Sequence, residues 1–316
     1  MKIAVGRAFE DAYGFAFKRF FSVLGTVWLP YVVLLIGFGL FFGRFFMNFA
    51  PIWLHALHGG MLHPYHPDPD EVRRLVFGGT SLFAFLPLLV LFALFVRSMV
   101  YVGLLELALG MRKGPVIAYW SFGAPVWRLF GASILAFVIL WVIAAVIGGT
   151  CAAIWFAVAN VAQAGLIRAI AVIVAIGLFF YSLLRLFFFL APVVVAEGHM
   201  GFGRSWQLGS GNVLRMIVTV LGVFIPAFFV FAIVSGAVRF ATLAPALSQM
   251  GDNTTPQQMW QIMTHQGLAY IVVAIVLQVI YSVIIFGLAA GLMASAYRSV
   301  APADNATLAA TTGSPA

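Results

Sequence analysis

Four of the six histidines in this chain fall in one polar segment, with the spacing H-x2-H-x4-H-x2-H. They are His55, His58, His63 and His66. Asp68, Asp70 and Glu71 follow directly. Neutral imidazoles bind zinc, copper or nickel, and carboxylates can complete such shells, so the segment predicts a metal site, with Zn or Cu as the expected ion. Two other interpretations stay open: a polar outer loop that tolerates histidine, and a pH sensor, since histidine titrates near neutral pH.

Two arginines interrupt apolar stretches at equivalent places. Arg97 stands thirteen residues before Gly110, and Arg185 stands thirteen residues before Gly198. At about 1.5 Å per residue of helix, each arginine would lie roughly 18–20 Å from its glycine, approaching the centre of a bilayer. An arginine at that depth costs at least about 2.5–3.5 kcal/mol on insertion scales. We therefore expect both side chains to face protein, a partner or water.

Two interpretations of these arginines remain open. In the first, each guanidinium pairs inside the protein, with Glu106, Glu197 or a backbone carbonyl. In the second, Arg97 and Arg185 line a cationic cleft that binds a lipid phosphate or another anion, and Arg204 adds to the same charge. The planar donor fork of arginine suits either role.

The composition determines which medium surrounds these residues. Apolar residues make up 64% of the chain and charged residues only 8%, whereas a soluble domain carries about a quarter charged residues. Lipid must therefore cover much of the surface. The net charge of +8 then indicates contact with anionic headgroups rather than nucleic acid. We expect membrane lipids, and membrane proteins, as partners.

The hydropathy pattern predicts an all-α polytopic membrane protein with about six transmembrane helices. Residues 1–300 form a single integral membrane domain, and 301–316 form a disordered tail. Residues 1–20 have apolar side chains at helical spacing, which is typical of an amphipathic helix at the membrane surface. Gly287, Gly291 and Ser295 recur every four residues and predict a packing face. The expected spans are 21–46, 80–109, 129–158, 166–196, 213–237 and 268–294.

The distribution of basic residues indicates the orientation. Six spans place both termini on one side, and the loops on that side hold the larger group of Lys and Arg: Lys2, Arg7, Lys18, Arg19, Arg112, Lys113, Arg128, Arg204, Arg215 and Arg298. The opposite loops hold the smaller group: Arg44, Arg73, Arg74, Arg168 and Arg239. Because cytoplasmic loops are rich in Lys and Arg, we expect both termini in the cytoplasm.

Three segments of the chain resemble one another. GFAFKRFFSVLG, GAPVWRLFGASI and SGNVLRMIVTVL align with Arg19, Arg128 and Arg215 in register. Each follows an amphipathic aromatic stretch and leads into a predicted span. We interpret the chain as three hairpin repeats, each preceded by an amphipathic interfacial helix.

The segment between the fourth and fifth spans carries a motif: Pro192, Glu197, Gly198, Arg204, Ser205, Trp206, Leu208, Gly211 and Asn212. It resembles the signature of a bacterial six-span inner-membrane family that includes the membrane domain of glycerophosphodiester phosphodiesterases and YciC-like proteins. The resemblance implies a location in the bacterial inner membrane. It implies no activity, because catalysis in that family's enzymes lies in a separate soluble domain. From position alone, we expect Ser205 to cap a helical turn and Trp206 to anchor at headgroup level.

These observations leave three hypotheses about function. The first is a non-enzymatic inner-membrane protein that serves membrane or envelope organisation, binding anionic lipid or partner proteins. The second is a transporter or lipid-handling protein with Arg97 and Arg185 in its cleft. The third is a periplasmic metal-binding or metal-sensing protein that uses the histidine segment. A Ser-His-Asp triad is not apparent, because His199 is the only histidine expected on the cytoplasmic side.

Overall fold

The computed structural model describes the backbone of 2–57, 69–112, 117–159, 161, 163–249 and 256–301. Side chains are described for 2–43, 85–112, 117–159, 161, 163–242, 244 and 272–301. His58, His63 and His66 lie outside the described residues, and His55 is described only as backbone. The metal-site prediction therefore stays a prediction.

The described residues are helical almost throughout. In chain order the helices are α1 (Val5–Lys18), α2 (Phe20–Leu57), α3 (Pro69–Ala108), α4 (Ala124–Ala157), α5 (Ala164–Phe187), α6 (Leu190–Glu197), α7 (Phe202–Gly209), α8 (Val213–Gln249) and α9 (Pro256–Val300). Six stretches in the described chain are long and apolar enough to cross a membrane: Phe20–Gly43, Phe85–Ala108, Ala124–Ala157, Ala164–Glu197, Val213–Thr242 and Val272–Val300. The predicted all-α fold with six spans is confirmed.

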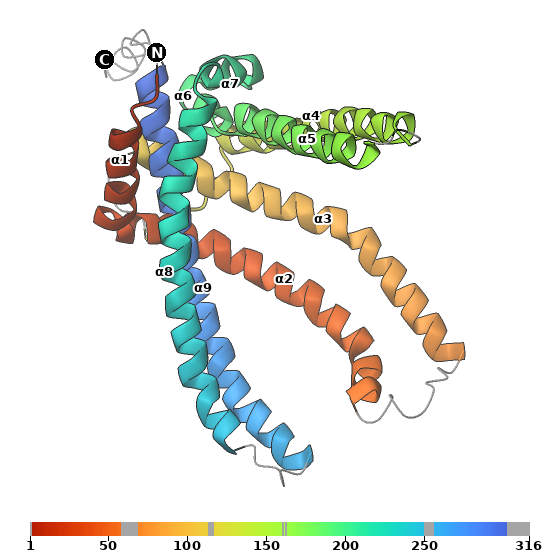
Figure 1. The fold of residues 1–316 in the computed structure, drawn as a ribbon. Coiled ribbons are helices and arrows are strands. Elements are labelled where there is room, and N and C mark those ends of the chain that lie inside the picture. Colours follow the sequence, from red (N-terminus) through yellow and green to blue (C-terminus); the bar gives the residue numbers. More distant parts are fainter. Residues whose placement is uncertain are drawn as a thin grey trace.

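The long helices form three hairpins, α2–α3, α4–α5 and α8–α9, which diverge from a common base that holds the start of α1 and the end of α9 (Figure 1). We call this base the hub, and the diverging remainder of the hairpins the arms. The hub consists of α1, α6, α7 and the helix ends 20–27, 96–108, 124–140, 185–189, 213–223 and 283–300. Almost all buried side chains in the described chain belong to the hub.

Helix α1 packs antiparallel to the hub end of α9. Its alanines Ala8, Ala12 and Ala16 are buried, and they recur every four residues, on one face of the helix. A Cβ built on Gly291 would lie 3.0 Å from the Cα of Ala12, and one on Gly287 would lie 3.2 Å from the Cα of Ala16. The alanine face of α1 thus contacts protein, and the glycines of α9 permit the close approach.

Glycines with positive φ end two of the helices at the hub. Gly110 follows α3 with φ of +79°, and Gly198 caps α6 with φ of +69°. Glycine adopts this left-handed conformation without a Cβ penalty, which explains its use at helix C-termini. These glycines are the reference points from which Arg97 and Arg185 are equally spaced.

Short helices precede two of the three hairpins. Helix α1 leads into α2, and α7 leads into α8. The described residues between α3 and α4, 109–112 and 117–123, form no helix. Instead, the backbone N–H of Tyr119 donates to the carbonyl of Gly25, and the indole of Trp28 donates to the carbonyl of Ile117. This connection is therefore fastened to α2, and the three-repeat interpretation stays a prediction.

Candidate anion-binding site

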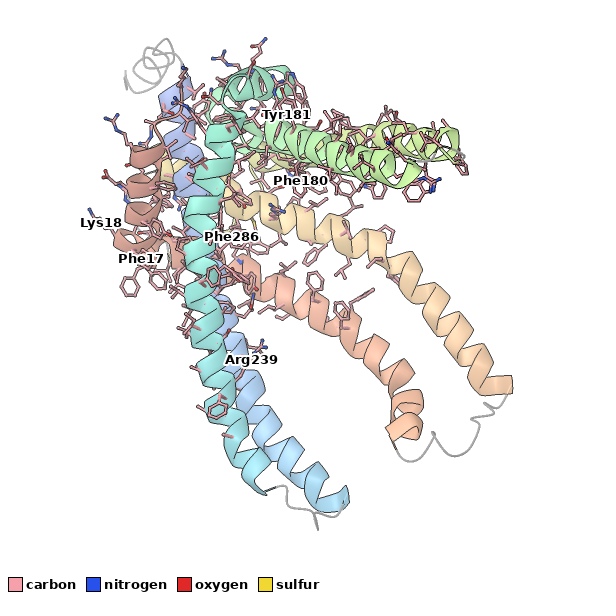
Figure 2. All side chains as sticks on the ribbon, in the orientation of Figure 1. Phe17, Lys18, Phe180, Tyr181, Arg239 and Phe286 are labelled. Carbon is pink, nitrogen blue, oxygen red and sulfur yellow. The ribbon has the colours of Figure 1, made fainter. Side chains whose placement is uncertain are left out.

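Arg185 is buried inside the hub and has partners there. Its side chain is 9% exposed. Nη2 donates to the carbonyl of Trp206 at 2.8 Å, and Nη1 donates to the hydroxyl of Tyr181 at 2.7 Å. The guanidinium also lies over the Trp206 ring, 4.0 Å from its centroid. Tyr181 lies where α5 meets α7 (Figure 2). These contacts agree with the first interpretation, in which the guanidinium of Arg185 pairs with a group inside the protein.

The carbonyl that Arg185 binds belongs to the last turn of α7. Carbonyls in a last turn lack partners within their own helix and carry the negative end of the helix dipole. A guanidinium at this place satisfies one carbonyl and complements the dipole. Ser205 supports the same junction from α7: it is fully buried, and its hydroxyl donates to the carbonyls of Arg185 and Leu186. The Ser205 hydroxyl therefore bonds carbonyls at the C-terminal end of α5 and does not cap a following turn.

Arg204 has a partner within the hub as well. Its Nε lies 3.3 Å from Oε1 of Glu197. The same carboxylate oxygen accepts a hydrogen bond from the hydroxyl of Tyr297 at 2.8 Å. Glu197 therefore joins α6, α7 and the end of α9. His199 lies 3.7 Å from the other oxygen of Glu197.

The remaining motif residues fix the turns around α6 and α7. Pro192 is buried within α6. The carbonyl of Gly198 accepts a 2.6 Å hydrogen bond from Arg128 at the start of α4. Gly211 forms the turn into α8 with φ of +73°. The motif therefore builds the hub, and this structural role accounts for Pro192, Gly198 and Gly211 without a ligand.

Asn212, the last motif residue, holds the N-terminal segment. Its Oδ1 accepts a hydrogen bond from the backbone N–H of Ile3 at 3.1 Å, and Arg215 donates to the carbonyl of Ile3 at 2.8 Å. Both backbone groups of Ile3 are thus bonded, and its side chain is fully buried. The sequence contains no signal for this contact between residues more than 200 positions apart.

A third polar cluster lies where the α3–α4 connection meets α2. Arg112 donates to the hydroxyl of Thr26 at 2.9 Å and lies over the ring of Tyr119. The Tyr119 hydroxyl lies 3.4 Å from Glu106. Burial raises the pKa of Tyr119, and the neighbouring Glu106 raises it further. Glu106 is thus engaged here, not with Arg97.

Arg97 differs from all of these arginines. Its side chain is exposed, and within the described part of the chain it makes no hydrogen bond or ion pair. It makes a cation–π contact with Tyr101, whose ring centroid lies 5.3 Å from the guanidinium carbon. The guanidinium is thus available to an anion.

Arg97 lines a pocket of about 120 Å³ where the α3 and α4 arms join the hub. The lining residues come from α3, α4, the α5–α6 junction and α9: Leu94, Arg97, Ser98, Tyr101, Leu129, Ser133, Phe187, Leu190, Ala191 and Met293. Arg97 is the charged residue among them, and the rest of the lining is apolar apart from three hydroxyls. Arg185 is not part of this lining, so the two arginines do not share a cleft.

Two of the three hydroxyls in the pocket make no hydrogen bond to any part of the chain that the structure describes. The Ser98 hydroxyl donates to the carbonyl of Leu94 in its own helix. Neither the Ser133 nor the Tyr101 hydroxyl makes a hydrogen bond in the described chain. Donors from α3 and α4 therefore converge on one pocket whose lining contains no carboxylate. Sequence reasoning singled out Arg97 but missed Tyr101 and Ser133, because nothing in the sequence indicates that they share its pocket.

Comparison with protein-family models, curated proteins and solved structures finds no match. The resemblance to the six-span inner-membrane family therefore stays a prediction from the motif residues.

Proposed function

We propose that this chain is a non-enzymatic protein of the bacterial inner membrane that binds an anionic lipid by its phosphate in the Arg97 pocket. Its role would be in membrane or envelope organisation. One observation carries the proposal: an unpaired guanidinium lies in a pocket on a helix that is otherwise apolar enough to cross a membrane. Such a charge requires an anionic or aqueous partner, and a lipid phosphate is the anion that the membrane itself supplies.

The position of Arg97 along α3 supports a lipid headgroup as that partner. Residues 75–96, between Arg74 and Arg97, contain no charged residue. At about 1.5 Å per residue this run is about 33 Å long, close to the ~30 Å hydrocarbon thickness of a bilayer. If it crosses the bilayer, Arg97 lies at the cytoplasmic boundary and not near the centre, and the hub lies at the level of the inner headgroups.

The apolar part of the pocket lining suits a lipid better than a soluble anion. A pocket of about 120 Å³ is smaller than the ~300–1,000 Å³ of pockets that enclose drug-sized ligands. It has room for a phosphate group but not for acyl chains. The chains would extend along the neighbouring arms, where apolar side chains such as Leu88, Leu91 and Leu135 are exposed.

Replacement of Arg97 tests the proposal. We expect Arg97→Gln, in protein reconstituted into nanodiscs, to lose most of its retention of anionic lipid, measured by mass spectrometry of co-purified lipid. Arg239→Gln is the matched control, because Arg239 is also an exposed arginine in an apolar span but lies on the far half of α8, away from the hub (Figure 2). Equal retention by both variants would contradict the proposal.

The transporter hypothesis has less support. It requires Arg97 and Arg185 in a common cleft, whereas Arg185 is bonded to Trp206 and Tyr181 inside the hub. The motif resemblance supports the location in the inner membrane.

A further inference from the structure

We propose that the Arg97 pocket prefers lipids whose headgroup is a bare phosphate monoester, the class of phosphatidic acid, over phosphodiester and zwitterionic lipids. This inference rests on the proposed function and specifies its ligand.

The donors in the pocket match the oxygens of a monoester. The Arg97 guanidinium offers several N–H groups in a planar fork, and the unpaired hydroxyls of Tyr101 and Ser133 add a donor each. A phosphate monoester presents three terminal oxygens and carries a charge of about −1.5 to −2 at pH 7. A phosphodiester presents two such oxygens and one charge. A monoester can therefore give each of these three side chains its own terminal oxygen, whereas in a phosphodiester two of the side chains have to share one.

The charges around the pocket disfavour a zwitterionic headgroup. None of the lining residues is Asp or Glu, and the nearest carboxylate along α3, Glu106, is engaged with Tyr119. The ammonium of an ethanolamine or choline headgroup would find no anion here and would be repelled by Arg97. Discrimination by an unmatched charge is a common basis of specificity.

The size of the pocket also favours a bare phosphate over a larger headgroup. A pocket of about 120 Å³ is smaller than the ~300–1,000 Å³ of pockets that enclose drug-sized ligands, and it suits a group as small as a phosphate. A headgroup extended by glycerol or a sugar would have to hold the extra atoms outside the donors.

The ionisation of a phosphate monoester should make its binding depend on pH. The second ionisation of a phosphate monoester has a pKa of about 6, so binding should strengthen as the pH rises from 5 to 7.5. A phosphodiester has no ionisation in this range. Tyr101 and Arg97 on α3 are the titratable groups of the lining. The parts of α4, α5, α6 and α9 that line the pocket contribute no titratable group.

Competition for a fluorescent phosphatidic acid in detergent tests the inference. The competitors are phosphatidic acid, phosphatidylglycerol, phosphatidylethanolamine and inorganic phosphate, each at pH 5 and pH 7.5. We expect phosphatidic acid to compete best and to gain affinity at pH 7.5, while phosphatidylglycerol does not change with pH. Arg97→Gln should weaken phosphatidic acid about tenfold or more, and Ser133→Ala and Tyr101→Phe about three- to tenfold each, with smaller effects on phosphatidylglycerol.

The outcomes separate this inference from the function on which it rests. If Arg97→Gln leaves binding of every lipid unchanged, the proposed function itself is wrong. If binding depends on Arg97 but phosphatidylglycerol or phosphatidylethanolamine competes as well as phosphatidic acid at both pH values, only the monoester preference is wrong. If inorganic phosphate competes as well as phosphatidic acid, the source of the phosphate is not a lipid. Arg239→Gln, which should bind like the unaltered protein, controls for the loss of charge.

Discussion

Where helices cross in the hub, glycines are closely packed, whereas most glycines of the arms have open space around them. In the hub, a Cβ on Gly103 would lie 2.6 Å from the ring of Tyr119, and one on Gly222 would lie 2.5 Å from the ring of Phe9. In the arms, a Cβ on Gly39, Gly148 or Gly177 would meet nothing within 4 Å, and Gly37 is the exception, with a Cβ position 2.9 Å from the ring of Phe92 where α2 faces α3. The hub is therefore packed like the core of a soluble protein, where side-chain size is restricted. The arms present their residues to lipid or to other proteins.

The two arginines show the same contrast at equivalent sequence positions. Arg185 is bonded on the hub side of its helix, and Arg97 is exposed where the arms begin. The difference shows two ways in which an arginine in an apolar span is accommodated. Its guanidinium either donates to a backbone carbonyl inside the protein or remains exposed to a ligand. The four predictions below test the contrast between hub and arms through stability.

The largest effect is expected for Arg185→Leu. The substitution removes two hydrogen bonds made by a charged group and leaves the carbonyl of Trp206 without a partner, so we expect a loss of about 2–4 kcal/mol. Thermal unfolding in detergent, followed by circular dichroism, measures it. Arg97→Leu should change stability by less than about 0.5 kcal/mol, because surface substitutions rarely exceed this. Similar losses for both variants would contradict the contrast between the bonded, buried arginine and the exposed one at the edge of the hub.

A substitution at the α1–α9 contact should have the next largest effect. We expect Gly291→Val to destabilise the protein by about 1–3 kcal/mol, because its Cβ would lie 3.0 Å from Ala12 and from Phe15 and would separate the helices. Faster proteolysis within α1 should accompany the loss of stability. Gly177→Val, in an arm with nothing within 4 Å of its Cβ position, is the control and should leave α1 protected.

The contact of Asn212 with the N-terminal segment predicts a smaller, local effect. Asn212→Ala leaves the buried N–H of Ile3 without its acceptor, at a cost of about 1–2 kcal/mol. Hydrogen exchange of the N-terminal peptide should speed up while the peptides of α4 and α5 stay unchanged. Ser182→Ala serves as the control, because the Ser182 hydroxyl bonds only within its own helix. An unchanged exchange rate at the N-terminus would show that Asn212 does not hold Ile3.

Hydropathy predicted the six spans because lipid requires long uninterrupted apolar runs. The interval between Gly287 and Gly291 also predicted a packing face, which the structure confirms, but it did not identify α1 as the partner. The contacts of Arg185 could not be predicted, because they depend on how separate helices pack together. Whether Arg185 finds a backbone carbonyl depends on how α5 meets α7, and periodicity within one helix says nothing about this.

The same limit applies to the pocket. Ser133 lies 36 positions after Arg97, on the next long helix, and a lone serine in an apolar helix most often bonds its own backbone, as Ser98 does. Only the packing of α3 against α4 and α6 shows that Ser133 and Arg97 line one pocket. The motif residues could be recognised as a group from the sequence, whereas the interactions of Asn212 and Ser205 are seen only in the structure.

The smallest expected effect comes from one substitution made in both regions. Gly148→Ala places a methyl group in open space on α4. Since alanine favours a helix over glycine, stability should stay unchanged or rise by up to about 0.5–1 kcal/mol. Gly103→Ala is the same change in the hub, where the methyl group would collide with Tyr119 and Thr26, and it should destabilise the protein. Unfolding in detergent compares the two. If Gly148→Ala destabilised the protein as much as Gly103→Ala, the α4–α5 arm would be packed against a further surface, most simply that of a second copy or a partner protein. The arms would then be an interface, and the contrast with the hub would hold only for the isolated chain.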